Sequence, residues 1–173
     1  MGRSLARAQA LQLLFQAEAN GRGVDDVLSG DEYALEEGPL DEYGAELALG
    51  ADGMRHELDA LIAMRSPSWS VSRMPAVDRN LLRLALYEMI TQDDVALAVT
   101  IDETVELAKA YGTDDSPRFV NGLLGRVADD LEAGEHIFGD YTGAEIVLND
   151  AESFGSFVSG YWWSIYADRM RMR

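Results

Sequence analysis

The stretch TDDSPRFVNG, in the last third of the chain, combines two carboxylates, a cation and an aromatic ring. Ser116 is a natural helix N-cap, Pro117 suits the first helical position, and Asp114 and Asp115 complement the dipole of a helix that follows them. Arg118 does not fit this pattern, because a cation in the first turn opposes the positive end of the helix. The pattern therefore predicts that an anion from outside the helix interacts with Arg118.

Phe119, the next residue, has two possible roles. An aromatic side chain in the first turn of a helix is usually part of the core, but an exposed ring can stack on an unpaired RNA base, which contributes about 1–3 kcal/mol. Asp114 and Asp115 are similarly ambiguous, since they can complement the helix dipole, pair with Arg118, or accept hydrogen bonds from base amino groups. Both a plain helix start and an RNA contact remain open at this stage.

Two further pairs of arginines have helical spacing. Arg3 and Arg7 are four residues apart, so they share one face of a predicted first helix, and Arg79 and Arg83 do the same on a later helix. Arg3 and Arg7 could simply be solvent-exposed at the start of their helix. Arg79 and Arg83 could instead pair with acids of the same molecule, for example Arg83 with Glu88 or with acids across the bundle.

Charge is unevenly distributed along the 173 residues. The chain has 14 basic and 31 acidic residues and a net charge of -17, which on average repels nucleic acid and anionic membranes. Residues 1–22 and 65–83 nevertheless carry net charges of +2 and +3, whereas residues 23–64 carry -11. Two short basic segments therefore stand out in a chain that is otherwise acidic.

The composition also excludes several classes of function. The chain has no cysteine, which excludes disulfides, thiolate zinc sites and thiol nucleophiles. His56 and His136 are far apart and lack the spacing of metal ligands. We predict no catalytic residue, no metal site and no cofactor. No apolar run approaches the length of a membrane span, so we expect a soluble cytoplasmic protein that does not bind membranes.

Apolar periodicity predicts helices throughout the first 134 residues. The predicted helices cover residues 4–20, a long stretch from Tyr43 to Leu61, a central helix after Pro75, a helix that ends at Gly112, and a last core helix from Pro117 to Gly134. The glycines at 50 and 53 either kink the long helix or let a neighbouring helix approach closely. Residues 21–40 are predicted as a loop. Residues 95–101 are predicted as an apolar connection, with Thr100 and Glu103 forming a capping box.

The last forty residues have a different character. Eight of the fifteen aromatic residues lie in 135–173, and apolar residues at helical spacing lead to an end that contains three arginines. We predict an additional helix that packs on the body; an aromatic and basic binding surface is the alternative. The predicted protein is therefore all-α, with a helical domain at 1–133 and an aromatic-rich extension at 134–173.

Three stretches carry a family resemblance: ARAQALQLLFQAE, MPAVDRNLLRLALYEMI and VTIDETVELAKAYGTDDSPRFVNGLL. They resemble the NusB family of bacterial transcription antitermination factors, and the resemblance covers residues 3–131. It implies a compact all-helical fold of two small bundles and no catalysis. It also implies binding of boxA-type single-stranded RNA together with the ribosomal protein NusE, in an RNA polymerase antitermination complex that acts chiefly on ribosomal RNA operons.

The resemblance also identifies candidate residues. In this family, RNA-binding residues lie in the first helix and in the turn before the last core helix, and the matching positions here are Arg3, Arg7, Phe15, Asp115 and Phe119. Asp78 matches an acid at the surface for RNA and NusE. The complete predicted RNA-binding set is Arg3, Arg7, Phe15, Arg79, Asp115, Arg118 and Phe119. The predicted partner-binding residues are Asp78, Arg83 and Asp114.

Ser4 and Leu5 stand where the family often has arginines, so we expect this protein to bind RNA weakly without a partner. A related arrangement occurs at the N-terminus of some RNA cytosine methyltransferases, but this chain has neither a catalytic cysteine nor a glycine-rich cofactor loop. The remaining alternative is a protein-interaction module that does not bind RNA and that self-associates as a homodimer.

Overall fold

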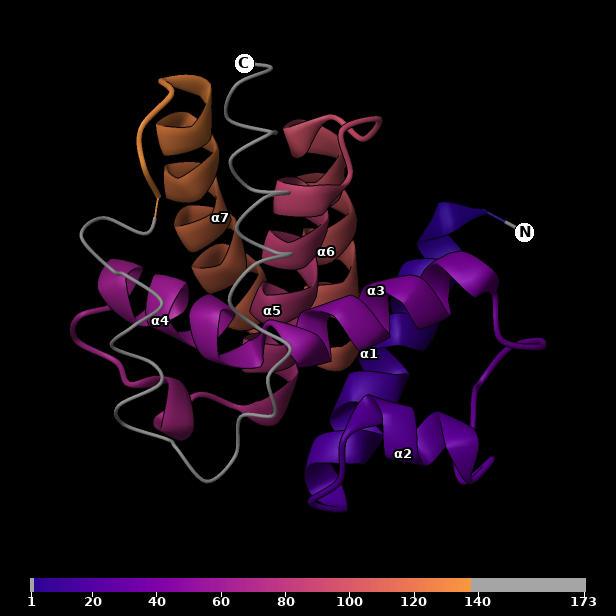
Figure 1. Ribbon diagram of the computed structural model, residues 1–173. Helices are drawn as coiled ribbons and strands as arrows, with labels where there is room; N and C mark the ends of the chain where they lie inside the picture. Colours follow the sequence, from indigo (N-terminus) through magenta and orange to yellow (C-terminus); the bar gives the residue numbers. More distant parts are fainter. Residues whose placement is uncertain (1, 138–173) are drawn as a thin grey trace.

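The computed structural model describes residues 2–137, and this part of the chain consists of α-helices and one short 3-10 helix, without a β-strand. Figure 1 shows the arrangement. The helices are α1 (Arg3–Ala19), α2 (Val24–Ser29), α3 (Glu42–Gly53), α4 (Arg55–Arg65), the 3-10 helix η1 (Val71–Arg73), α5 (Ala76–Thr91), α6 (Leu97–Tyr111) and α7 (Ser116–Glu132). The all-α prediction is confirmed. The predicted tail helix falls at 138–173, outside the described residues.

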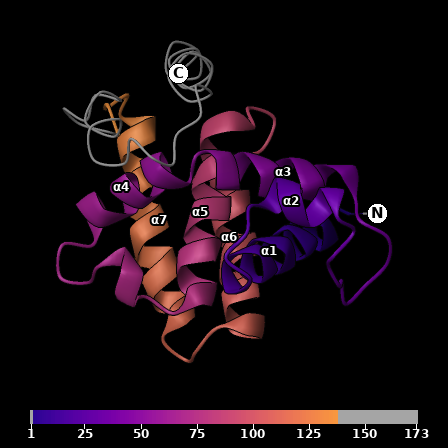
Figure 2. The same cartoon turned by 60° about the horizontal axis from the view of Figure 1, so that its bottom comes forward.

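Helix α5 is the centre of the core. Twelve of its sixteen residues are buried, and it packs against α1, α3, α4, α6 and α7. Figures 1 and 2 show α1, α2 and α3 gathered on one side of α5, while α4 and α7 lie on the other. A helix that is apolar on more than one side must be surrounded in this way, which the sequence of α5 predicted.

The predicted long helix from Tyr43 to Leu61 is two helices. The chain bends at Met54, whose backbone (φ -101, ψ 15) ends α3 and begins α4. The two glycines have different roles. Gly50 lies against the ring of Tyr87 on α5, where a Cβ atom would come within 1.9 Å of the ring, whereas Gly53 adjoins the bend and has open space around it. Gly50 therefore allows α5 to approach α3 closely, and the helix breaks next to Gly53.

Two other boundaries differ from the prediction. Residues 21–40 contain a short helix, α2, because Val24 and Val27 are fully buried and require a regular turn of backbone to reach the core. Helix α6 begins at Leu97, so Thr100 is inside the helix and does not cap it. Burial of Val95 and Leu97 draws this segment into the core, and tertiary packing overrides the local capping pattern.

Candidate nucleic-acid interface

The turn between α6 and α7 is held in place by a buried carboxylate. Ser116 Oγ donates a hydrogen bond to Asp78 Oδ1 at 2.6 Å and accepts one from the backbone N–H of Thr113 at 2.9 Å. The prediction that Ser116 caps α7 is wrong, because Ser116 is the first residue of the helix. The N-cap position is Asp115, whose side chain makes no cap hydrogen bond. Asp78 is only 2% exposed, so it fixes the turn from below and does not face solvent.

The electrostatics of Asp78 follow from this position. Burial raises the pKa of its carboxyl above the ordinary value, and the hydrogen bond from Ser116 offsets part of the rise. Gly112 completes the turn, because a Cβ atom there would lie 2.6 Å from the Ser116 side chain. The backbone of the turn therefore has little freedom.

The rest of the turn faces outward. Asp114, Asp115 and Arg118 are exposed, and Arg118 has no ion pair or hydrogen-bond partner among residues 2–137. Phe119 has features of both predicted roles: it packs partly against the core, and it remains partly exposed. Its ring meets that of Trp69 edge to face, with centroids 4.9 Å apart and an interplanar angle of 66°.

Two of the three predicted RNA-binding residues of helix α1 are exposed to solvent. Arg3 is exposed, pairs with Asp94 at 2.7 Å and lies over the ring of Tyr43, 4.7 Å from its centroid. Phe15 is 42% exposed. Since Arg3 and Phe15 are twelve residues apart, they are separated by about 18 Å along the helix.

Arg7, the third, is in the interior and only 4% exposed. Its Nε lies 2.9 Å from both carboxylate oxygens of Glu88, and the Tyr43 hydroxyl donates to the same carboxylate at 2.5 Å. Glu103 is 3.5 Å away. Neither an RNA contact nor a solvated helix start describes this arginine, which instead joins α1 to α5 and α6.

Arg79 and Arg83 both pair within the molecule. Arg79 bonds to Glu18 and to the carbonyl of Met74, while Arg83 pairs with Asp59 at 2.7 Å and with Glu18 at 3.1 Å. Pairing of Arg83 with acids across the bundle is confirmed, but the suggested partner Glu88 is wrong, because Arg7 occupies it. The Arg83 side chain is 9% exposed and that of Arg79 20%.

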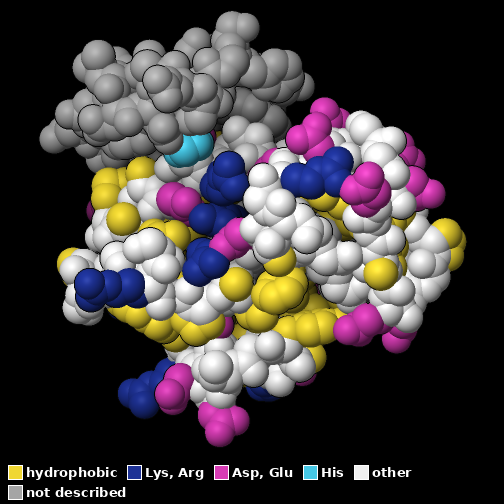
Figure 3. All heavy atoms as spheres, turned by 90° about the horizontal axis from the view of Figure 1, so that it is seen from below, with side chains coloured by type: hydrophobic (Ala, Val, Ile, Leu, Met, Phe, Trp, Pro, Cys, Tyr) yellow, Lys and Arg dark blue, Asp and Glu magenta, His cyan; other side chains and the backbone are white. Residues whose placement is uncertain are grey.

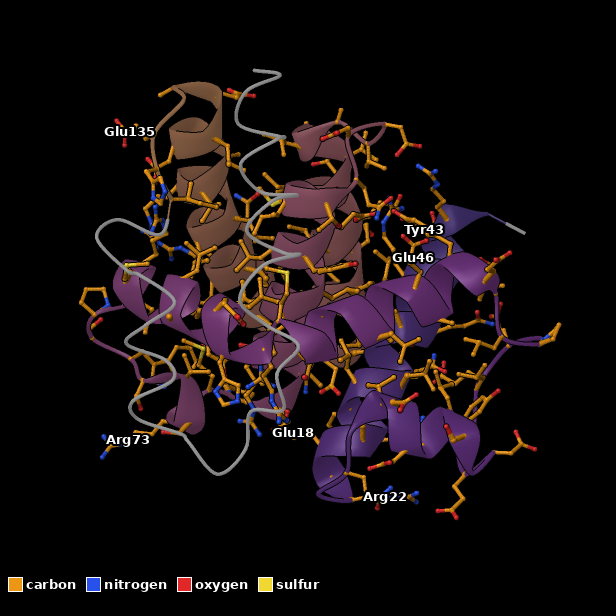
Figure 4. All side chains as sticks on the ribbon, in the orientation of Figure 1. Glu18, Arg22, Tyr43, Glu46, Arg73 and Glu135 are labelled. Atoms are coloured by element: carbon orange, nitrogen blue, oxygen red, sulfur yellow. The ribbon has the colours of Figure 1, made fainter. Side chains whose placement is uncertain are left out.

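Glu18 is the hub of this network. Burial acts to raise the pKa of its carboxyl, but hydrogen bonds from Arg79 and Asn80 and the charges of Arg79 and Arg83 bring the pKa below the ordinary value. Figure 4 labels Glu18 at the lower side of the molecule, between Arg73 and Arg22. Figure 3 looks onto this side, where hydrophobic side chains gather in the middle, with arginines and acids around them.

Two features of this region were not predicted from the sequence. Trp69 contacts Phe119 from a position fifty residues earlier, and the only available signal was an aromatic residue within the basic segment 65–83. The second feature is the path of α1 beside α6, seen where Gln12 donates to the Tyr111 hydroxyl at 3.1 Å. This contact places the middle of α1 near the end of α6.

Within residues 2–137, no group of three or more histidine or acidic residues has the geometry of a metal site. None of the helices in this part is both long and apolar enough to cross a membrane. The surface described above carries cations, carboxylates and aromatic rings.

Comparison with known proteins identifies the family. The family model described as "NusB family" matches residues 4–129. The transcription antitermination protein NusB of Saccharopolyspora erythraea is 46% identical over 127 residues, which cover 73% of this chain and 86% of that protein. The NusB of Streptomyces coelicolor is 43% identical over 131 residues, covering 73% and 92%.

Solved structures agree. The structure of T. maritima NusB has a TM-score of 0.63 and 36% identity, covering 75% of this chain and 92% of the other. A structure of the antitermination factors NusB and NusE in complex with double-stranded RNA has a TM-score of 0.61 and 25% identity, covering 73% and 96%. The family model and the identity to these relatives show that the chain belongs to the NusB family.

Proposed function

We propose that this protein is a transcription antitermination factor that binds boxA-type single-stranded RNA jointly with NusE and promotes processive transcription of ribosomal RNA operons. It acts in the cytoplasm as part of an RNA polymerase antitermination complex. The observation that carries the proposal is the turn at 113–116, which is locked from below and presents Arg118 and Phe119 to solvent. Relatives that carry the name of antitermination proteins support it.

In this proposal the predicted residues divide by exposure. The exposed or partly exposed ones contact RNA or NusE directly: they are Arg3, Phe15, Asp114, Asp115, Arg118 and Phe119. Arg3 and Arg118 neutralise phosphates, the rings of Phe15 and Phe119 stack on bases, and Asp115 accepts hydrogen bonds from base amino groups. Asp114 faces NusE.

The buried residues position this surface. Asp78 fixes the turn through Ser116, Arg7 holds α1 on α5 through Glu88, and Arg83 binds the end of α1 through Glu18. Arg79 is partly exposed, so it adds a weak phosphate contact at the margin, where Glu18 already balances its charge. Rigid support of this kind reduces the ordering cost of binding.

Two weak surfaces then act together. This chain offers few free cations in an acidic molecule, so its affinity for RNA alone is low. NusE supplies the second surface, and holding one short RNA between the two proteins makes the second contact effectively intramolecular. The affinity that neither protein has alone comes from this joint binding.

A protein-interaction module that self-associates remains the second candidate. It is favoured by the pairing of Arg7, Arg79 and Arg83 with acids, which leaves less free positive charge than the sequence predicts. A homodimer in this case would use the same exposed turn. RNA binding and dimerisation would then exclude each other.

Transcription through a terminator placed after boxA tests the proposal. The protein and NusE are added to polymerase with the other components of the antitermination complex, and a template with scrambled boxA is the control. We expect more read-through only on the boxA template, and less with Phe119→Leu. Equal read-through on both templates, with a dimer in sedimentation that RNA and NusE do not dissociate, would favour the interaction module.

A further inference from the structure

The pairing of cations singles out two arginines. Between residues 2 and 137, every other arginine and the one lysine has a carboxylate or backbone carbonyl within bonding distance. Arg73 and Arg118 have neither, and both are exposed. Because an acidic chain has many carboxylates available, these two arginines are the ones in this part whose charge a polyanion could use without displacing an acid.

These two arginines belong to segments that meet at an aromatic contact. Trp69 lies just before η1 and Arg73 ends it, while Arg118 directly precedes Phe119 at the start of α7. The rings of Trp69 and Phe119 are 4.9 Å apart, edge to face, and both are partly exposed. In an edge-to-face pair, the ring that contributes its edge has neither of its faces covered by the other ring.

The segment that carries Trp69 and Arg73 is held at both ends. Ser66 Oγ donates to the carbonyl of Trp69 at 3.1 Å, and Arg79 donates to the carbonyl of Met74 at 2.6 Å. The second segment is fixed by the bond between Ser116 and Asp78. The aromatic contact therefore joins two ordered pieces of backbone, so little ordering cost accompanies binding.

We propose that Trp69, Arg73, Arg118 and Phe119 form one surface for single-stranded RNA, here called the Trp69 surface. The RNA that the turn at 113–116 contacts continues across η1, where Arg73 neutralises a phosphate and Trp69 stacks on a base. The exposed hydroxyls of Ser70 and Ser72 lie on the same segment and can bond to phosphate or ribose. This inference rests on the proposed function, and it assigns RNA contacts to η1, outside α1 and the turn before α7.

The chemistry favours RNA over an acidic protein segment. Partly exposed aromatic rings beside unpaired cations match a polymer that alternates flat bases with phosphates. The exposed Asp114 and Asp115 border this surface and would repel a run of carboxylates along the whole contact. RNA can place a base amino group at those positions instead.

The test is a salt series of binding to a labelled boxA RNA with flanking nucleotides, in the presence of NusE. Each lost phosphate contact on a single strand lowers the slope of log affinity against log salt by about 0.7. We expect this decrease for Arg73→Gln and for Arg118→Gln, with an additive effect in the double variant. Arg55→Gln, on α4, is the matched control and should not change the slope.

Trp69→Leu keeps apolar packing beside Phe119 but removes the stacking face, and we expect roughly a fivefold to hundredfold loss of affinity. Trp69→Phe should retain most of the affinity, and circular dichroism and thermal melting confirm the fold of each variant. A normal slope for Arg73→Gln beside a lowered slope for Arg118→Gln overturns the proposal and leaves the proposed function intact. Absence of RNA binding by the wild type, even with NusE, overturns both.

A third result would assign the surface to a protein. NusE is titrated with the same variants without RNA. Weaker binding of NusE to Arg73→Gln or Trp69→Leu, in the absence of RNA, would contradict the RNA contact. Unchanged binding of NusE, together with the lowered salt slope, supports it.

Discussion

Arg7 on α1 and Glu88 on α5 form a buried ion pair, with Nε 2.9 Å from both carboxylate oxygens, although they are 81 residues apart in the chain. The Tyr43 hydroxyl donates to the same carboxylate, and burial together with this bond to Glu88 raises the tyrosine pKa well above its usual range. Three helices thus share one carboxylate. A residue that resembles a nucleic-acid contact in the sequence is part of the frame that holds α1.

Replacing Arg7 should therefore affect stability more than RNA binding. Arg7→Met leaves Glu88 buried without its cation, and we expect a loss of about 3–5 kcal/mol in the free energy of unfolding, measured with urea. The salt slope of RNA binding should stay unchanged. Arg3→Gln is the matched variant and should lower the slope by about 0.7 with little change in stability. Equal slope losses for both would contradict the buried role.

Glu18 should support stability in a pH-dependent manner. Its folded-state pKa is below the ordinary value, so its contribution is present above the ordinary carboxyl pKa and is lost as pH falls through the lowered value. Glu18→Gln should cost about 1–3 kcal/mol at neutral pH, and the difference from wild type should shrink in acid. Unfolding measured across a pH series checks this. Glu106→Gln, on an exposed pair, should show almost no difference at any pH.

The turn before α7 should depend on Ser116 more than on the charge of Asp78. Ser116→Ala leaves both Asp78 and the Thr113 N–H without their partner, and we expect a loss of about 1–3 kcal/mol. The exposed Ser72→Ala is the control and should be neutral. A neutral Ser116→Ala would show that the hydroxyl does not hold the turn.

Asp78→Asn should behave differently, because its amide oxygen can still accept from Ser116. Burial raises the pKa of Asp78, so the contribution of this group is present below the ordinary carboxyl pKa and is lost as pH rises through the raised value. The asparagine variant should therefore gain stability relative to wild type as pH rises. Thermal melts at acidic and neutral pH measure the trend, and the opposite trend would mean that the charge is stabilised by the fold.

The two glycines of α3 give a matched pair. Gly50→Ala places a methyl group inside the Tyr87 ring, so α3 and α5 must separate, at a cost of about 1–3 kcal/mol or more. Gly53→Ala meets nothing within 4 Å and should be neutral or stabilising, since alanine favours helices. Chemical denaturation of both variants measures the difference in their free energies of unfolding. Equal effects would mean that Gly50 is not a contact point.

Periodicity predicted α1, α5 and α7 closely, because each buries one or more apolar faces at helical spacing. It allowed a kink at Gly50 or Gly53 but did not predict two separate helices that meet at Met54, because the apolar spacing continues from α3 into α4 without interruption. It also missed α2, whose six residues contain too few turns for a periodic signal.

Exposure of the candidate residues could be predicted only where it depends on the local sequence. Exposure of Arg3, Phe15 and Arg118 agrees with the local pattern, since each lies near a helix end or on an outer face. Burial of Arg7 and Asp78 could not be predicted, because their partners come from other helices, 81 and 38 residues away. The charge of a residue gives no information about which distant group neutralises it.

Joint recognition of RNA with NusE is tested by binding of labelled boxA RNA with and without NusE, for the wild type and for Phe119→Leu. We expect weak binding of RNA by the wild type alone, much tighter binding once NusE is present, and loss of most of that gain in the variant, whose fold is checked by its thermal melt. An absence of RNA binding at low salt, even with NusE, would contradict joint recognition.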